Sequence, residues 1–181
     1  DDASRDAHAA IAAELSGEVA VALASGGGPF PALESDPSGS APADAEFREW
    51  LARGFHGEME YLARHADSKY HPAQLLPGCR CIAFAAVNYY QPLPSLPADA
   101  GRIARFAWGR DYHKTLGKRL LRVRRRLESL YPNDEFRNFT DAVPLNERHF
   151  AEQAGIGFRG RHTLLISPRF GSWFVIGEIL A

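Results

Sequence analysis

The sequence CIAFAAVNY at residues 81–89 decides the fold class. Its apolar side chains occupy both alternating faces, which is typical of a strand covered on both sides by other layers of the protein. We therefore expect a central strand here. The segment that follows, residues 91–101, contains three prolines and predicts a linker over the surface.

The longest predicted helix, residues 111–130, would form one covering layer. Asp111 is placed to cap it and Pro132 to end it. One apolar stripe recurs at steps of three and four residues and should face the core. It consists of Tyr112, Leu116, Leu120, Val123, Leu127 and Leu130.

The remaining segments predict a mixture of helices and strands without strict alternation. Helices are expected over residues 3–15, 44–53 (capped by Asp44), 57–65 and 144–153, with Pro144 in the first turn. Strands are expected over residues 18–24, 136–140, 163–167 and 172–179, with a flexible loop at 25–42 and a Gly-rich loop at 154–160. We therefore expect an α+β fold, with a mixed sheet flanked by helices.

The bulk composition fits one domain over residues 1–181, 45% of which are hydrophobic. No apolar run reaches the ~20 residues that span a bilayer, and the acidic start is unlike a signal peptide. A cytoplasmic monomer without a membrane partner is the simplest expectation, and the missing initiator Met suggests an excised piece. Cys79 and Cys81, one residue apart, predict neither a disulfide framework nor a metal site, and small buried side chains explain them.

Charge is distributed unevenly along the chain. Residues 1–67 hold 13 acidic and 4 basic residues, whereas residues 68–181 hold 9 acidic and 17 basic ones. The predicted helix at 111–130 and its start carry much of this excess, including Arg110, Lys114, Lys118, Arg122 and Arg125. A nucleic-acid backbone is one partner for such a face, because phosphates bind cationic and forked guanidinium groups. The alternative is a solvated face that pairs with the acidic part of the chain.

Asp141 is a candidate proton donor. It follows a predicted strand, and a carboxyl at a strand end can point into a cleft. Partial burial there would let it donate a proton near neutrality. An Asx-turn or a helix cap explains the same position without a function. A near-match to Asp-x-His-x-x-Gly at 111–117 is interpreted as coincidence, because the glycine comes one residue late and the histidine falls within a helix.

Six ordered stretches together resemble the N-terminal half of the epoxyqueuosine reductases. They are GFHGEMEYL at 54–62, LPG at 76–78, RFAWGRDYHK at 105–114, DAVPLNER at 141–148, AEQAGIGF at 151–158 and GSWF at 171–174. The resemblance covers about residues 50–180. It implies an oxidoreductase with a nitroreductase-like corrinoid-binding domain.

The resemblance also implies a cofactor, a partner and site residues. The cofactor would be base-off cobalamin, contacted by Lys69, Ala104, Asp141, Leu165 and Ile176, with no protein ligand to the metal. Asp141 would be the proton donor. The partner would be tRNA carrying epoxyqueuosine, which is reduced to queuosine in the last step of queuosine biosynthesis.

Departures from the family pattern limit what this chain is expected to do alone. The family's iron–sulfur clusters need cysteines that are absent here, so electrons would come from an external donor or a missing domain. Arg161-His162 replaces a basic residue followed by Asn, and the 25–42 segment looks unlike the family. Two alternatives stay open: a non-catalytic corrinoid- or tRNA-binding module, and a relative of the flavin-dependent nitroreductases.

Overall fold

A four-stranded antiparallel sheet forms the centre of the computed structural model, which describes residues 19–25 and 42–181. Its strand order is β1-β2-β6-β3. The strands are β1 (Val19–Ser25), β2 (Cys81–Asn88), β3 (Arg137–Phe139) and β6 (Phe174–Leu180). β2 lies between β1 and β6 and is buried along most of its length, as predicted from its apolar run.

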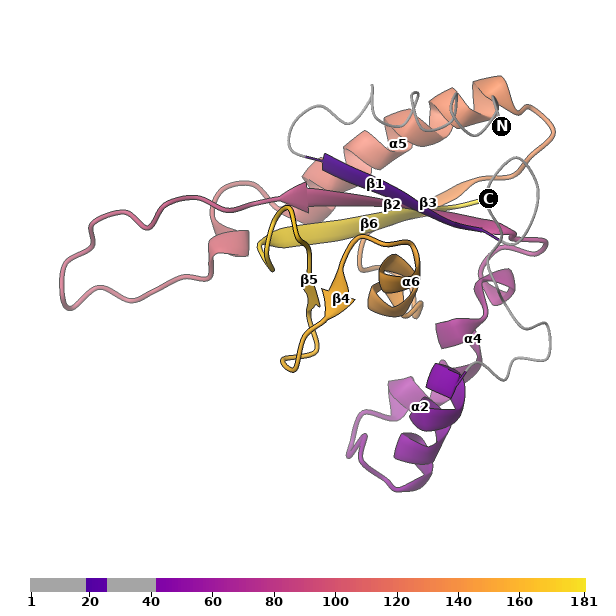
Figure 1. The fold of residues 1–181 in the computed structure, drawn as a ribbon, viewed down its shortest axis with the longest axis horizontal. Coiled ribbons are helices and arrows are strands. Elements are labelled where there is room, and N and C mark those ends of the chain that lie inside the picture. Colours follow the sequence, from indigo (N-terminus) through magenta and orange to yellow (C-terminus); the bar gives the residue numbers. More distant parts are fainter. Residues whose placement is uncertain (1–18, 26–41) are drawn as a thin grey trace.

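The two faces of this sheet are covered by different elements (Figure 1). Helix α5 (Tyr112–Leu130) packs its Leu116, Leu120, Val123 and Leu127 against one face. Helix α6 (Glu147–Gln153) and a hairpin of β4 (Phe158–Arg159) and β5 (Leu165–Ile166) lie on the other face. There Phe150, Ile156 and Leu165 pack with the side chains of β2 that α5 does not contact. These two layers confirm an α+β fold.

A group of short helices extends from the α6 side of the sheet (Figure 1). It contains α2 (Pro42–Ala52), α3 (Glu60–Arg64), α4 (Ala66–Tyr70) and the 3-10 turn η1 (Pro72–Gln74). A second 3-10 turn, η2 (Arg105–Ala107), follows the exposed segment between β2 and α5. In α2, the buried Asp44 accepts a hydrogen bond from Arg48 at 3.1 Å and lies 3.6 Å from His71 Nε2. Asp44 thereby ties α2 to the start of η1.

Close packing of α5 on the sheet depends on Gly177 in β6. A Cβ added there would lie 2.6 Å from Leu120 Cδ1 and 3.1 Å from Leu116 Cδ2. A side chain at this position would therefore push the helix away from the sheet. Because Gly177 has no side chain, Leu116 and Leu120 of α5 can pack directly on β6.

Several element predictions need correction. All strand pairs among the described residues are antiparallel, so the expected mixed sheet is wrong; the strand patterns carried no information on direction. Helix α2 begins at Pro42, which places Asp44 in the first turn and not at the cap. Helix α6 begins at Glu147 because Asn146 caps it, accepting from His149 N at 3.3 Å.

Smaller differences concern helix ends and loops. The helix expected at 57–65 is α3, which is shorter, and the Gly-rich loop at 154–160 includes β4. Leu130 in the last turn of α5 is exposed and does not extend the core stripe. The helix predicted at 3–15, and all but the two ends of the loop predicted at 25–42, lie outside the described residues.

Candidate functional site

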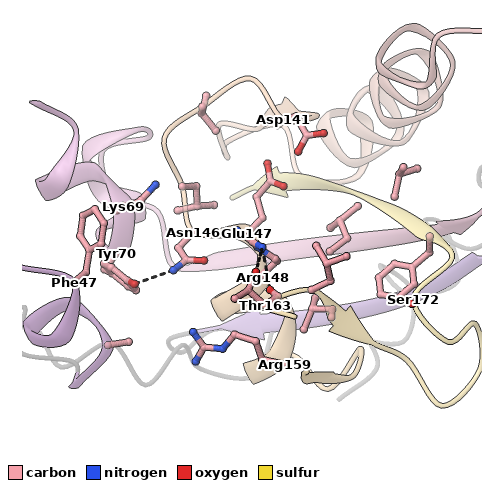
Figure 2. A pocket seen from close by; sticks show the side chains of 18 of the residues that line it. Phe47, Lys69, Tyr70, Asp141, Asn146, Glu147, Arg148, Arg159, Thr163 and Ser172 are labelled. Carbon is pink, nitrogen blue, oxygen red and sulfur yellow. Dashed lines mark hydrogen bonds between the residues drawn. The ribbon is translucent and has the colours of Figure 1, made fainter. Parts of the chain in front are cut away.

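An open cavity of about 990 Å³ lies between the short helices, α6, the β4–β5 hairpin and the end of the sheet where α5 begins. Its walls are mainly aromatic and aliphatic. They include Phe47, Trp50, Tyr89, Phe106, Val143, Leu145, Leu165, Phe174, Val175 and Ile176. Polar and charged side chains gather at two places in this apolar wall, an acidic place and a basic place (Figure 2).

The acidic place is built around Asp141, just after β3. Its backbone is left-handed, with φ of 51°, which is rare for a residue other than glycine and concentrates at functional sites. The Tyr112 hydroxyl, from the first turn of α5, donates a hydrogen bond to Asp141 Oδ2. His113 Nε2 lies 3.8 Å from the same oxygen. The start of α5 therefore holds the carboxyl at the cavity.

Two further carboxyl groups lie behind Asp141. Glu147, in the first turn of α6, lines the cavity and extends toward Asp141 (Figure 2). Burial, and then the charge of Asp141, raises the pKa of Glu147 far above its usual range. Glu178 in β6 is 0% exposed, and burial followed by the charge of Glu147 raises its pKa as well. The acidic place therefore runs from the cavity into the core.

The basic place lies at the other side of the cavity, where α4 meets α6 (Figure 2). It consists of Lys69, Arg148 and Arg159. Burial, and then the charge of Arg148, lowers the pKa of Lys69, and its Nζ lies 5.5 Å from the centre of the Phe47 ring. Arg148 donates to the Thr163 carbonyl at 2.9 Å. A partly desolvated cationic group of this kind favours an anionic ligand.

Hydrogen bonds fix α4 to the start of α6 across the cavity floor. Asn146 N donates to the Lys69 carbonyl at 2.8 Å, and Asn146 Nδ2 donates to the Tyr70 hydroxyl at 2.8 Å. The Tyr70 ring meets His149 edge-on at 5.3 Å. Lys69 and Glu147 are thus placed on one rigid frame.

The structure brings together four of the five residues predicted to contact a cofactor. Lys69, Asp141, Leu165 and Ile176 all line the cavity. Ala104 does not; it is exposed at the start of η2, two residues before Phe106, which does line it. Asp141 is not the cap of α6, since Asn146 has that role.

The basic residues predicted to bind RNA lie on the exposed side of α5 and at its start. Arg110, Lys114, Lys118, Arg122 and Arg125 are all exposed. Most of α5 is separated from the cavity by the sheet, and only its N-terminal end reaches the cavity, through Tyr112. Asp111 caps the helix by accepting from His113 N at 3.0 Å, as predicted.

Sequence reasoning missed Tyr112, Glu147 and Glu178 as members of the site. Glu178 had a usable signal, because a single acid inside an otherwise apolar strand must be buried with a partner or protonated. Tyr112 was assigned to the core stripe of α5, and Glu147 carried no signal beyond its place in a predicted first turn. Within the described ranges, no group of three or more His, Cys, Asp or Glu side chains is arranged to hold a metal ion. No helix in those ranges is long and apolar enough to cross a membrane.

Comparison with known proteins identifies similar sequences and folds. Residues 69–142 match the family described as "Epoxyqueuosine reductase QueG, DUF1730". The epoxyqueuosine reductase of Vibrio cholerae is 38% identical over 136 residues, which cover 72% of this chain and 37% of that protein. The epoxyqueuosine reductases, which are oxidoreductases and which this sequence resembles, are thus relatives of this chain. The chain spans about two fifths of their length.

Solved structures show the same fold. The epoxyqueuosine reductase of Streptococcus thermophilus matches with a TM-score of 0.71 at 24% identity, covering 99% of this chain and 44% of that one. An epoxyqueuosine reductase solved with an epoxyqueuosine-modified tRNA-Tyr stem loop matches with a TM-score of 0.65 at 20% identity, covering 45% of that chain. The described fold is therefore that of one part of these enzymes.

Proposed function

We propose that this chain, as a partial member of the epoxyqueuosine reductases, is their corrinoid-binding domain, and that it takes part in reducing epoxyqueuosine to queuosine in tRNA. The observation that carries this proposal is the placement of Asp141 in a large apolar cavity together with Lys69, Leu165 and Ile176. The relatives that span the matched region are named for this reaction.

The cavity fits a large flat cofactor such as cobalamin. At about 990 Å³ it lies at the upper end of the ~300–1,000 Å³ range of small-molecule sites, and it is open to a further ligand. Its described lining contains neither His nor Cys, which agrees with the base-off cobalamin without a protein ligand to cobalt that the family resemblance implies. Apolar side chains would contact the ring, and Lys69, Arg148 and Arg159 would face its polar or anionic substituents.

The reaction needs protons as well as electrons. Removing an epoxide oxygen as water consumes two electrons and two protons. Cobalamin, when bound, would supply the electrons, and the iron–sulfur clusters that the resemblance implies would be their source. Asp141 donates a proton to the departing oxygen. The hydrogen bond from Tyr112 and the left-handed backbone hold its carboxyl toward the cavity.

The basic face of α5 would bind tRNA phosphates near the cavity. Arg110 and Lys114 lie beside the end of α5 that reaches the cavity, and Lys118, Arg122 and Arg125 continue along the exposed side. A relative solved with a modified tRNA stem loop supports RNA as the ligand class. We further infer a single nitroreductase-like domain that acts as a monomer in the cytoplasm, where tRNA is modified.

A spectral titration with cobalamin tests the proposal. Adding the purified chain to cobalamin should change its visible absorption to that of the base-off form. Ser172→Trp places a large ring in the cavity wall and should weaken binding at least tenfold. Ser95→Trp, in the exposed 91–101 segment, makes the same change away from the cavity and should bind like the parent chain. An unchanged cobalamin spectrum with the parent chain would refute the proposed cofactor.

A further inference from the structure

The proposed reaction consumes two protons, but Asp141 can carry only one. The need for a second proton rests on the proposed function, whereas the test described below does not depend on it. The second proton must come from water entering the cavity or from another acid in the protein. Glu147 and Glu178 are the acids that lie directly behind Asp141.

Glu178 has an environment that a charged carboxylate would not tolerate. It is 0% exposed, and among the described residues neither Oε1 nor Oε2 meets a hydrogen-bond donor. It lies in β6 between Phe84 of β2 and Phe139 of β3, in the middle of the sheet. An unpaired buried carboxylate costs several kcal/mol, so such a group keeps its proton instead.

Glu147 connects Glu178 to Asp141. Besides burial, the negative charge of Asp141 raises the pKa of Glu147, and the charge of Glu147 raises the pKa of Glu178, so each carboxyl group is a neighbour of the next. Two ionised carboxylates have only acceptor atoms, so a hydrogen bond between them requires a proton on one of the two. The three carboxyl groups thus form a chain from the cavity to the core.

The groups that face this chain of acids include one cation, Lys69 of α4, whose charge interacts with that of Glu147. From α5, the Tyr112 hydroxyl donates a hydrogen bond to Asp141, and His113 Nε2 lies 3.8 Å from Asp141 Oδ2. Asp111 adds a further negative charge near Tyr112. Burial and the neighbouring carboxyl groups raise the pKa values of both Glu147 and Glu178, and they outweigh the backbone amide of Asp141, which lowers the pKa of Glu147. No metal-binding group of side chains is present in the described part of the chain to replace the proton.

We propose that Glu147 and Glu178 store a proton behind Asp141 and return it to Asp141 after that carboxyl has protonated the substrate. Glu147 releases its proton to the Asp141 carboxylate and then shares the proton of Glu178 in a hydrogen bond between the two side chains. Water in the cavity then reprotonates the pair through Glu147, which lines the cavity. Only protons move, and no electrons are exchanged. Glu178 never touches the substrate; it acts through Glu147.

Infrared spectroscopy of the isolated chain tests this store directly, because a protonated carboxyl has a C=O absorption that a carboxylate lacks. At pH 7 the parent chain should show a protonated-carboxyl band. Glu178→Gln should remove most of it. Glu152→Gln is the matched control, since Glu152 is also in α6 but is partly exposed and pairs with Arg159 at 3.5 Å. The band should be unchanged in that variant.

Asp141→Asn tests the connection between the store and the site. Removing the Asp141 charge should move the loss of the band to lower pH, because that charge, in addition to burial, raises the pKa of both Glu147 and Glu178. A parent chain without the band at pH 7, or a band whose pH midpoint is the same in Asp141→Asn, would overturn the proposal. Failure of the cobalamin titration would instead overturn the proposed function, and the infrared result would stand without it.

Discussion

Asp141 joins an uncommon backbone conformation to a carboxyl held at the cavity. Its left-handed φ places the side chain toward Tyr112 and Glu147 instead of the α6 backbone. We predict that Asp141→Asn keeps cobalamin binding but lowers epoxide reduction by about 10²–10⁴-fold, the usual contribution of a positioned acid. The assay would use a chemical reductant as the source of electrons. Asp99→Asn, in the exposed segment before η2, should retain full activity.

Glu178 makes the stability of the protein depend on pH with a definite sign. Because its pKa is higher in the folded than in the unfolded chain, its favourable contribution is complete below the unfolded value of ~4.3. That contribution is lost as pH rises toward the folded value. Glu178→Gln cannot ionise, so relative to the parent chain it should gain stability between pH 5 and pH 8, by more than about 1 kcal/mol.

Urea unfolding at the two pH values measures this difference. Glu152→Gln provides the baseline for a surface glutamate with an arginine partner. An equal stability difference between Glu178→Gln and the parent chain at both pH values would mean that Glu178 is ionised throughout, which contradicts the expectation.

An individual site residue could be predicted when its place in a predicted element was enough to suggest its role. Asp141 was identified from its place at a strand end, whereas Lys69 was taken from the family resemblance and lies in α4. Ala104 was carried over from the family and lies outside the cavity lining. Glu147 and Tyr112 could not be recognised, because their function depends on three elements that meet only in the folded chain.

At the scale of elements, the close contact between α5 and β6 makes the packing sensitive to a single added methyl group. Gly177→Ala should destabilise the protein by about 1–3 kcal/mol, because its Cβ would lie 2.6 Å from Leu120 Cδ1. Gly117→Ala makes the same change within α5, where an added Cβ meets nothing within 4 Å. It should stabilise the helix by up to about 1 kcal/mol. Thermal and urea unfolding measure the stability of both variants. Equal changes in stability for Gly177→Ala and Gly117→Ala would contradict the packing described.

Element predictions succeeded where a pattern was long. The nineteen-residue helix α5 and the apolar strand β2 were found close to their bounds. Short elements were less predictable because their bounds depend on capping and strand pairing. Asn146 caps α6, so the helix starts later than predicted, and β4 pairs with β5 over only two residues. Strand direction depends on which strands pair, and period-two patterns do not encode it.

At the scale of the whole molecule, the basic side of α5 and the cavity lie on different faces of the sheet and meet at the start of α5. We predict that Lys114→Gln with Lys118→Gln weakens binding of an RNA stem loop. The slope of log affinity against log salt should fall by about 1–2, as expected for two lost phosphate contacts. Arg53→Gln with Arg64→Gln removes two charges from the acidic part and should leave the slope unchanged. Fluorescence anisotropy at several salt concentrations gives both values.

The overall class of the fold followed from the sequence, but the arrangement that makes the site did not. Helix and strand patterns, together with the apolar run of β2, were enough for an α+β assignment. Nothing in the spacing of residues 42–70 indicated that α2 and α4 would form one wall of the cavity opposite Glu147. Such contacts between distant segments arise from packing, which a single sequence does not reveal.

The position of β6 in the sheet governs when the protein can fold during its synthesis. β6 is hydrogen-bonded between β2 and β3, yet its residues 174–180 leave the ribosome after those of both neighbours. Until then, β2 has no partner on that edge, and the leucines of α5 lack the strand on which Gly177 receives them. Until residues 174–180 are made, the nascent chain therefore carries an open sheet edge and an uncovered apolar helix face, a state in which chaperones bind and aggregation competes.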